Sequence, residues 1–253
     1  MGKSYSEADH PRGGNPDNRG QYSEKNRIDW GPDVLADRAA DYVTSANSGD
    51  GTSAATFAYH ATAAVSGCSA HATARGNDSV AAVSGDGSDA ATWGLDSVAA
   101  VSGTKSDALA GGAGSAAVAC GEDSTAKASD FACAAVTTGD STTSTTTGGQ
   151  SSAVATGDDA DATAAGPDSV AVVSGDRSGA TVTQANSFAV ATGYECFARG
   201  AQGSWLVLAE RDGDMQVVAA KMVQVGSVDD GVLIKPDTGY QLVDGKLVEV
   251  QVL

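Results

Sequence analysis

The sequence predicts an all-β fold: a parallel β-solenoid (β-roll) of 18-residue two-strand coils, capped by a small C-terminal β meander. Three observations predict it. Glycine recurs every 18 residues without interruption from Gly49 to Gly193. Small side chains hold the same positions in each interval, and aromatic residues make up only 5% of the chain. Such a period is typical of a solenoid, and a core this poor in bulky side chains requires closely spaced backbones.

The repeat divides into two nonapeptide halves of the form G-x-x-S-x-A-x-x-x, and each half predicts one short strand. With the recurrent glycine counted as position 1, position 15 is alanine in every repeat. Position 6 is alanine in all but one, where Ser144 stands. Successive side chains of a strand point to opposite faces. We therefore expect positions 4, 6, 8 and 13, 15, 17 to point inward, and the glycines to form two corners that need positive φ.

Positions 14 and 16 then point outward and form a stripe of valine and alanine along one face. The predicted stripe consists of Val80, Val98, Val118, Val136, Val154, Val170, Val172, Phe188 and Val190. A long exposed apolar strip normally marks an interaction surface. We therefore expect self-association, most simply about a rotation axis parallel to the rod. The alternative is that inside and outside are reversed on this strand, so that the valines fill the core.

Acidic residues recur at two corner positions. Position 2 carries Asp50, Asp86, Glu122, Asp140, Asp158 and Asp176, and position 12 carries Asp78, Asp96 and Asp168. Stacked at the spacing of the coils, these columns could imitate a row of phosphates or bind scattered cations. We favour a role in turn chemistry, because an aspartate that follows a glycine accepts hydrogen bonds from nearby backbone amides.

The composition excludes several classes of function. The formal net charge of −17 argues against direct binding of nucleic acid through its phosphates. We find no nucleophile, base and orienting group in one constellation, so we expect no enzyme, no catalytic residues and no cofactor. We also expect no metal, because His10, His60 and His71 are not spaced as a metal site. A threonine-rich coil at 142–147 leaves an ice- or surface-binding solenoid as a minor alternative.

The four cysteines are predicted to be small buried residues. They are Cys68, Cys120, Cys133 and Cys196, and none belongs to a C-x-x-C pair. Two of them replace the recurrent serine of the repeat. No run of residues is apolar and long enough to predict a membrane span, and no secretion signal is visible.

The chain is expected to divide into a flexible polar tail at 1–31, an N-terminal cap at 32–48, the solenoid at 49–203 and a C-terminal β domain at 204–253. The cap is either a short helix that begins near Pro32 or an extended first coil. Hairpin signals at Asp212-Gly213 and Asp244-Gly245 predict a meander that covers the last strand edges of the rod.

Two resemblances follow from these motifs. The runs DSVAVVSGDRSGA (168–180), NDSVAAVSGDGSDA (77–90) and LDSVAAVSGTKSDA (95–108) resemble the repeats of trimeric autotransporter adhesin heads, which are parallel β-rolls that trimerise. The solenoid followed by GSWLVLAERDGD and IKPDTGYQLVDGKLVEV resembles a family of uncharacterised phage and prophage proteins. The second likeness covers most of the chain and implies a fold and a source but no activity.

Together these patterns lead us to expect a non-enzymatic, phage- or prophage-associated solenoid that self-associates, as a trimer if the adhesin likeness holds. It would act as a structural or binding module in the host cytoplasm or in the virion. The rival expectation is an acidic inhibitor of host immunity or of DNA-binding proteins, with a host protein as partner and the acidic columns as its working surface. Neither expectation involves a membrane or direct binding of nucleic acid.

Overall fold

The computed structural model describes residues 42–251. The predicted tail at 1–31, with His10, and most of the predicted cap at 32–48 lie outside the described residues. The first strand covers Thr44–Ser48, so these residues belong to the solenoid, which begins before Gly49 with an extended coil. The described residues belong to one compact unit.

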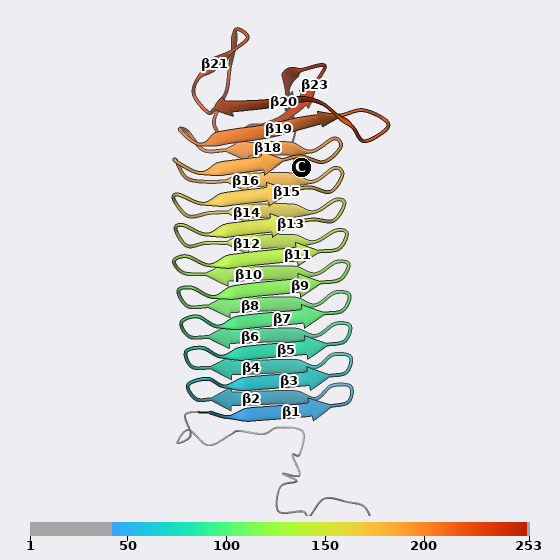
Figure 1. Cartoon of the computed structure of the whole chain (residues 1–253), viewed down its shortest axis with the longest axis vertical. Helices are drawn as coiled ribbons and strands as arrows, with labels where there is room; N and C mark the ends of the chain where they lie inside the picture. Colours follow the sequence, from blue (N-terminus) through green and yellow to red (C-terminus); the bar gives the residue numbers. More distant parts are fainter. Residues whose placement is uncertain (1–41, 252–253) are drawn as a thin grey trace, which may run out of the picture. The chain divides into compact units, whose positions relative to one another are not determined.

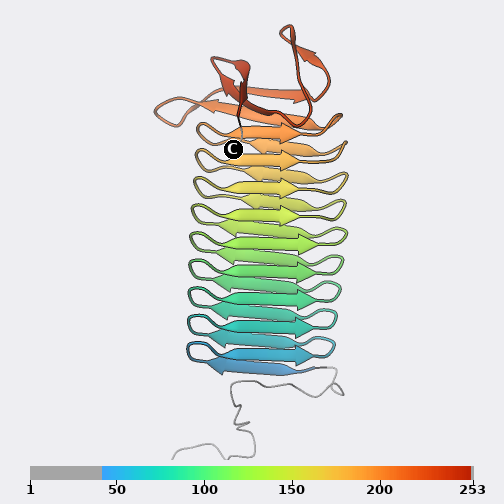
Figure 2. The same cartoon turned by 180° about the vertical axis from the view of Figure 1, so that it is seen from behind.

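The solenoid is built from two parallel sheets, and the chain alternates between them (Figure 1). The odd sheet contains β1 (Thr44–Ser48), β3 (Thr62–Ser66), β5 (Val80–Ser84), β7 (Val98–Ser102), β9 (Ala116–Cys120), β11 (Ala134–Thr138), β13 (Ser152–Ala155), β15 (Val170–Val173), β17 (Phe188–Ala191) and β19 (Trp205–Arg211). The even sheet, seen from its own side in Figure 2, contains β2 (Ser53–Phe57), β4 (His71–Arg75), β6 (Asp89–Trp93), β8 (Asp107–Gly111), β10 (Thr125–Ser129), β12 (Thr143–Thr146), β14 (Asp161–Ala164), β16 (Gly179–Val182) and β18 (Phe197–Gly200).

The coils stack in the predicted register. Val80 pairs with Val98 on the next odd strand, and Ala126 pairs with Ser144 on the next even strand, each 18 residues further on. The strands of successive coils run almost straight above one another, with little twist (Figure 1). Because successive coils stack in this register, the side chains at each position of the repeat form a straight column along the rod.

The interior is the thin layer of small side chains that the sequence predicts. Alanines at positions 6 and 15, such as Ala72 and Ala81, are at most 2% exposed. A polar coil divides this core into two apolar clusters, one ending at Ala135 and the other beginning at Ala153. Between them, Ser144 takes the place of the usual alanine and donates to the carbonyl oxygen of Ala135 at 2.6 Å.

Buried serines at positions 4 and 13 connect neighbouring coils. The Ser97 hydroxyl accepts a hydrogen bond from the amide of Ser79 at 3.3 Å and donates to the carbonyl oxygen of Gly76 at 3.1 Å. The amide of Ser97 in turn donates to the hydroxyl of Ser115 at 3.2 Å. A buried amide or carbonyl without a partner is costly, so these serines satisfy backbone groups that the narrow corners leave outside the ladders.

The glycine columns are explained by close stacking at the corners. A Cβ on Gly85 would lie only 2.1 Å from the carbonyl oxygen of Gly67, directly before it in the column. Two residues later the corner passes through the left-handed region, where the occupant need not be glycine: Gly87, Ser69 and Lys105 have φ values of 63°, 55° and 55°. At the corners that lead from odd to even strands, this glycine is therefore required by contact with the neighbouring coil.

The C-terminal part is antiparallel, as expected, and it continues both sheets. β19 lies parallel to β17 and antiparallel to β20 (Val217–Gln224). β23 (Gly239–Val243) lies antiparallel to both β18 and β24 (Lys246–Val250), and β21 (Val228–Asp229) pairs with β22 (Val232–Leu233). The strands β20 to β24 are called the cap below.

Larger side chains fill the interior under the cap. Leu206, Leu208, Ile234 and Tyr240 are at most 1% exposed. The Tyr240 hydroxyl accepts a hydrogen bond from the amide of Lys235 at 2.8 Å. Aromatic and branched residues thus replace alanine where the two sheets end and no further coil supplies small side chains.

The prediction for the cysteines was half right. Cys133 and Cys196 replace serines of the internal columns and are buried, and burial raises the pKa of both thiols. Cys68 and Cys120 are exposed, so the prediction that they are buried was wrong. The reason is position: Cys68 lies at the tip of a corner and Cys120 at the outward-facing end of β9.

Candidate interaction face

The predicted apolar stripe lies on the outer surface of the odd sheet. In β5, β7 and β9, the side chains at positions 14 and 16 are half-buried and those at positions 15 and 17 are buried. The alternative that the stripe valines fill the core is therefore wrong. The valines that lie inside on these strands, such as Val83 and Val173, occupy position 17. The outer surface of positions 14, 16 and 18 on the ten odd strands is called the odd face below.

Beyond the last 18-residue repeat, β19 carries the odd face on and β20 of the cap extends it, which sequence analysis did not predict. Trp205 and Val207 on β19 follow Phe188 and Val190 in register. On β20, Met222 lies opposite Val207 and is 58% exposed, and Val218 is 56% exposed. The signal in the sequence was the alternation in WLVLAE and VVAAKM, but it does not show which sheet these strands join.

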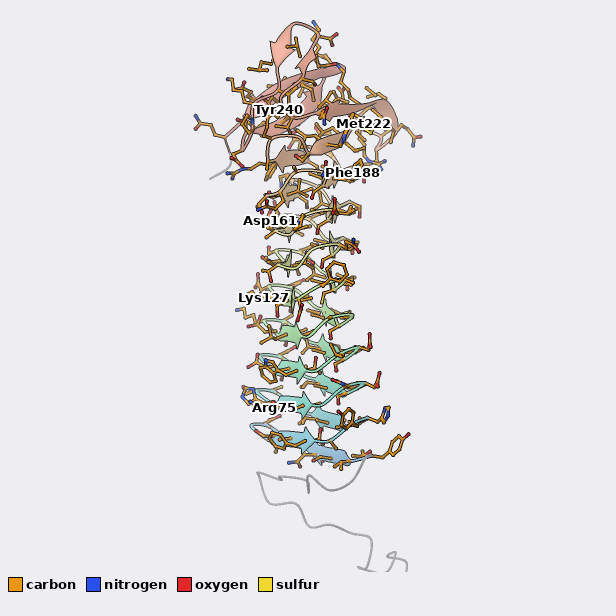
Figure 3. All side chains as sticks on the ribbon, turned by 90° about the vertical axis from the view of Figure 1, so that its left-hand side faces the viewer. Arg75, Lys127, Asp161, Phe188, Met222 and Tyr240 are labelled. Carbon is orange, nitrogen blue, oxygen red and sulfur yellow. The ribbon has the colours of Figure 1, made fainter. Side chains whose placement is uncertain are left out.

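The two outer faces differ in chemistry. Figure 3 places Phe188 and Met222 along one side of the stack and Arg75, Lys127 and Asp161 along the other. Position 18, at the edge of the odd face, is serine or threonine on every odd strand except at Cys120 and at Ala209 on β19. The odd face is therefore apolar with a row of hydroxyl groups, and its positions 14, 16 and 18 carry no charge before the cap.

The even face carries charges and polar groups. The Arg75 guanidinium lies between two rings, 5.6 Å from the centroid of Phe57 and 5.0 Å from that of Trp93, in a cation–π stack. His71 on this face faces Asp89 at 3.1 Å. Further along, three threonines lie in register on successive even strands: Thr145, Thr163 and Thr181.

The acidic columns lie at the corners, and the structure does not bring them together. The position 2 column occupies the corners that lead from odd to even strands, and the position 12 column occupies the opposite corners. At position 12, Asp78, Asp96 and Asp168 have φ values of 55°, 53° and 54°, so they are the left-handed residues of their turns. Aspartate tolerates this conformation better than most residues.

At position 2, the five aspartates bind the backbone of the next coil and, among the described residues, Glu122 does not. Asp140 accepts a hydrogen bond from the amide of Asp158 at 3.0 Å, Asp158 from that of Asp176 at 2.8 Å, and Asp176 from that of Tyr194 at 3.1 Å. Asp50 and Asp86 accept in the same way at 2.9 Å. The preferred role in turn chemistry thus has geometric support, although the amide belongs to the coil above and not to the same turn.

One charged pair joins two neighbouring corners. Arg177 donates to both carboxylate oxygens of Asp159, at 2.9 and 2.8 Å. The guanidinium holds the pKa of the Asp159 carboxyl below its usual range. Both groups are exposed, so this pair offsets local repulsion among the acids and adds little to the stability of the fold.

A cleft of about 220 Å³ lies between the cap and the last corner. Two of its three charged side chains, those of Glu210 and Arg211, already bind the backbone, and the third is that of Glu195. Glu210 accepts the amides of Asp244 and Gly245, both at 2.8 Å, and Arg211 donates to the carbonyl oxygen of Thr192 at 2.7 Å. The cleft therefore joins the cap to the solenoid, and the single carboxylate of Glu195 does not make a converging set of groups for a ligand.

Within residues 42–251, no three histidine, cysteine, aspartate or glutamate side chains are grouped so that they could hold a metal ion. The same residues contain no helix long and apolar enough to cross a membrane. No family model, curated protein or solved structure matches the chain.

Proposed function

We propose that this protein is a non-enzymatic structural or binding module that self-associates through the odd face. The observation that carries the proposal is the continuity of an uncharged, apolar surface along all ten odd strands of a straight solenoid. Isolated apolar residues on a surface need no explanation, but a contiguous patch of this length favours an interface.

The size of the odd face agrees with that of a stable interface. Ten strands at about 4.8 Å, each presenting about five residues of about 3.3 Å, give roughly 48 by 17 Å, or about 800 Å² per copy. Two copies would bury about 1,600 Å², the size typical of specific protein–protein complexes.

The distribution of charge supports the same face. The chain carries a net charge of −17, and in the solenoid the acids lie at the corners and on the even face. Like charge keeps copies apart wherever those surfaces meet. The odd face is the one long surface of the described solenoid where two copies can approach without this repulsion.

A phage or prophage origin, and a place in the host cytoplasm or the virion, are proposed from the sequence likeness described above. In that setting a straight, self-associating rod would serve as a spacer or as a scaffold for other proteins. The acidic inhibitor remains a separate proposal. Its support is that successive aspartates at position 2 lie one coil apart, about 4.8 Å by strand spacing.

Self-association is tested by adding two negative charges to each face in turn. Val136→Asp with Val154→Asp places them on the odd face, and Thr145→Asp with Thr163→Asp places the same charges on the even face. Burying uncompensated charge is costly, so the first pair should weaken association by at least about 100-fold, and the second should leave it unchanged. Sedimentation velocity over a concentration series measures both.

A wild-type chain that stays monomeric at the highest attainable concentration would refute the proposal. Equal weakening by both pairs would also contradict it, because the effect would then be one of net charge. The inhibitor proposal predicts instead that Asp140→Asn, Asp158→Asn and Asp176→Asn together abolish salt-sensitive binding to a DNA-binding host protein. Retained binding in that triple variant would exclude the acidic column as the contact.

A further inference from the structure

We propose that two copies pack odd face against odd face with their rods antiparallel. The two-fold axis runs along the strand direction and passes between β9 and β11. This inference rests on the proposed self-association and specifies its geometry. It replaces the axis parallel to the rod that the sequence alone favoured, and three features of the odd face lead to it.

The first feature is a step in side-chain size at position 16. This position is alanine in the first four odd strands, β1 to β7, and valine in the last six, β9 to β19. In the antiparallel arrangement every one of these alanines faces a valine. Examples are Ala64 with Val190, Ala82 with Val172, and Ala100 with Val154 of the second copy. The layer between the two sheets then has nearly constant thickness, as close packing requires.

An axis parallel to the rod would give a wedge. Each residue at position 16 would then face the same residue of the second copy. Alanine would therefore meet alanine over β1 to β7, and valine would meet valine over β9 to β19. Two flat sheets cannot be in contact along their whole length under that pairing. The alanine half would lose its packing contacts or enclose voids.

The second feature is the placement of the two largest side chains. Phe188, which is 38% exposed, and Trp205 occupy position 14 near the cap. In the antiparallel arrangement they face Thr62 and Thr44, which are the smaller residues at the far end of the same column. With the parallel axis, both aromatic residues of one copy would lie at the same end as those of the other and would hold the N-terminal coils apart.

The third feature is polarity across the strand. A two-fold axis along the strand direction keeps each position opposite itself, so the hydroxyl row at position 18 meets the hydroxyl row of the second copy. An axis along the rod exchanges positions 14 and 18. Val80 and Val98 would then oppose the hydroxyls of Ser84 and Ser102, leaving these groups without partners of their own kind.

The odd face also favours an isologous pair over a ring. A three-fold ring needs two different surfaces on each copy, whereas a two-fold pair uses one surface twice. The other long surfaces of the described solenoid are the even face, with its charged groups, and the acidic corners. One flat, self-complementary apolar face per copy therefore fits a dimer.

The geometry is tested with single cysteines and a short bismaleimide cross-linker. The exposed native thiols are first removed by Cys68→Ser and Cys120→Ser. In that background, Val118→Cys lies beside the proposed axis, and Ala64→Cys and Val190→Cys lie near opposite ends of the odd face. We expect Val118→Cys to cross-link with itself. We expect Ala64→Cys and Val190→Cys to cross-link only when the two variants are mixed.

The outcomes separate the geometry from self-association itself. Efficient self-cross-linking of Ala64→Cys and of Val190→Cys would show an axis parallel to the rod and overturn this inference, while leaving the proposed function intact. A sedimenting species with the mass of three chains would overturn it as well. A wild-type monomer in sedimentation would remove both proposals at once.

Discussion

Gly85 and Gly87 lie two residues apart in one corner, yet the structure predicts very different results for replacing each by alanine. At Gly85 the new Cβ would be 2.1 Å from the carbonyl oxygen of Gly67, and the residue has a φ of 149°. At Gly87 the nearest atom is the Ser69 hydroxyl at 3.8 Å, and φ is 63°. The first substitution collides with backbone, and the second only adopts an unfavourable conformation.

The magnitudes follow from these two contacts. Gly85 can make room only by separating two coils, which would stretch the bonds that the amides of Gly67 and Gly85 donate to Ser84 and Ser102, both 2.9 Å. Overpacking against rigid neighbours together with backbone strain should cost about 4 kcal/mol or more. Gly87→Ala should cost only about 1 kcal/mol, because a left-handed alanine has no clash to relieve here.

Urea unfolding followed by far-UV circular dichroism measures both variants, at one fixed protein concentration so that association affects each equally. A loss below about 1 kcal/mol for Gly85→Ala would refute the argument, since the column would then not need glycine for contact. The same conclusion would follow if Gly87→Ala were the more damaging of the two.

Three further predictions concern buried hydroxyls and the corner charges. Ser97→Ala should lower the free energy of unfolding by about 1–3 kcal/mol by leaving the buried amide of Ser79 and the half-buried carbonyl of Gly76 without this partner. Ser97→Cys should lower the free energy of unfolding less, because Cys133 already occupies another position of the same column. Equal losses of stability in the two variants would contradict this reasoning. The Thr146 hydroxyl has no partner among the described residues, so Thr146→Val should stabilise the protein by about 1 kcal/mol in the same urea assay. Thr142→Val should instead destabilise it, because the Thr142 hydroxyl is hydrogen-bonded. Finally, Arg177 lowers the pKa of the Asp159 carboxyl, so the small stabilisation by this pair is present above the ordinary carboxyl pKa and is lost as the pH falls through the lowered one. NMR titration should show the pKa of Asp159 rising in Arg177→Ala, and an unchanged pKa would mean that the pair does not form in solution.

Much of the candidate face could be predicted because each position of the repeat becomes a column. Strand alternation alone placed Val136 and Val154 outside and the alanines beside them inside. The same reasoning failed for Cys120, because resemblance to serine and threonine at position 18 says nothing about burial. Met222 and Val218 could not be assigned to the odd face from the sequence. Their strand is antiparallel and lies beyond the last repeat, so its residues do not correspond to positions of the repeat.

The sequence by itself determined the rod, its 18-residue register, its inner and outer faces and the stripe of valines. It could do so because a strict period, combined with strand alternation, assigns each residue of the repeat to the inside or the outside of its coil. Only the tertiary structure decided how the chain ends: the cap strands join both sheets and extend the apolar face. The arrangement of the cap depends on pairing between segments that do not repeat and on the packing of large side chains beneath them. No local sequence pattern encodes these long-range contacts.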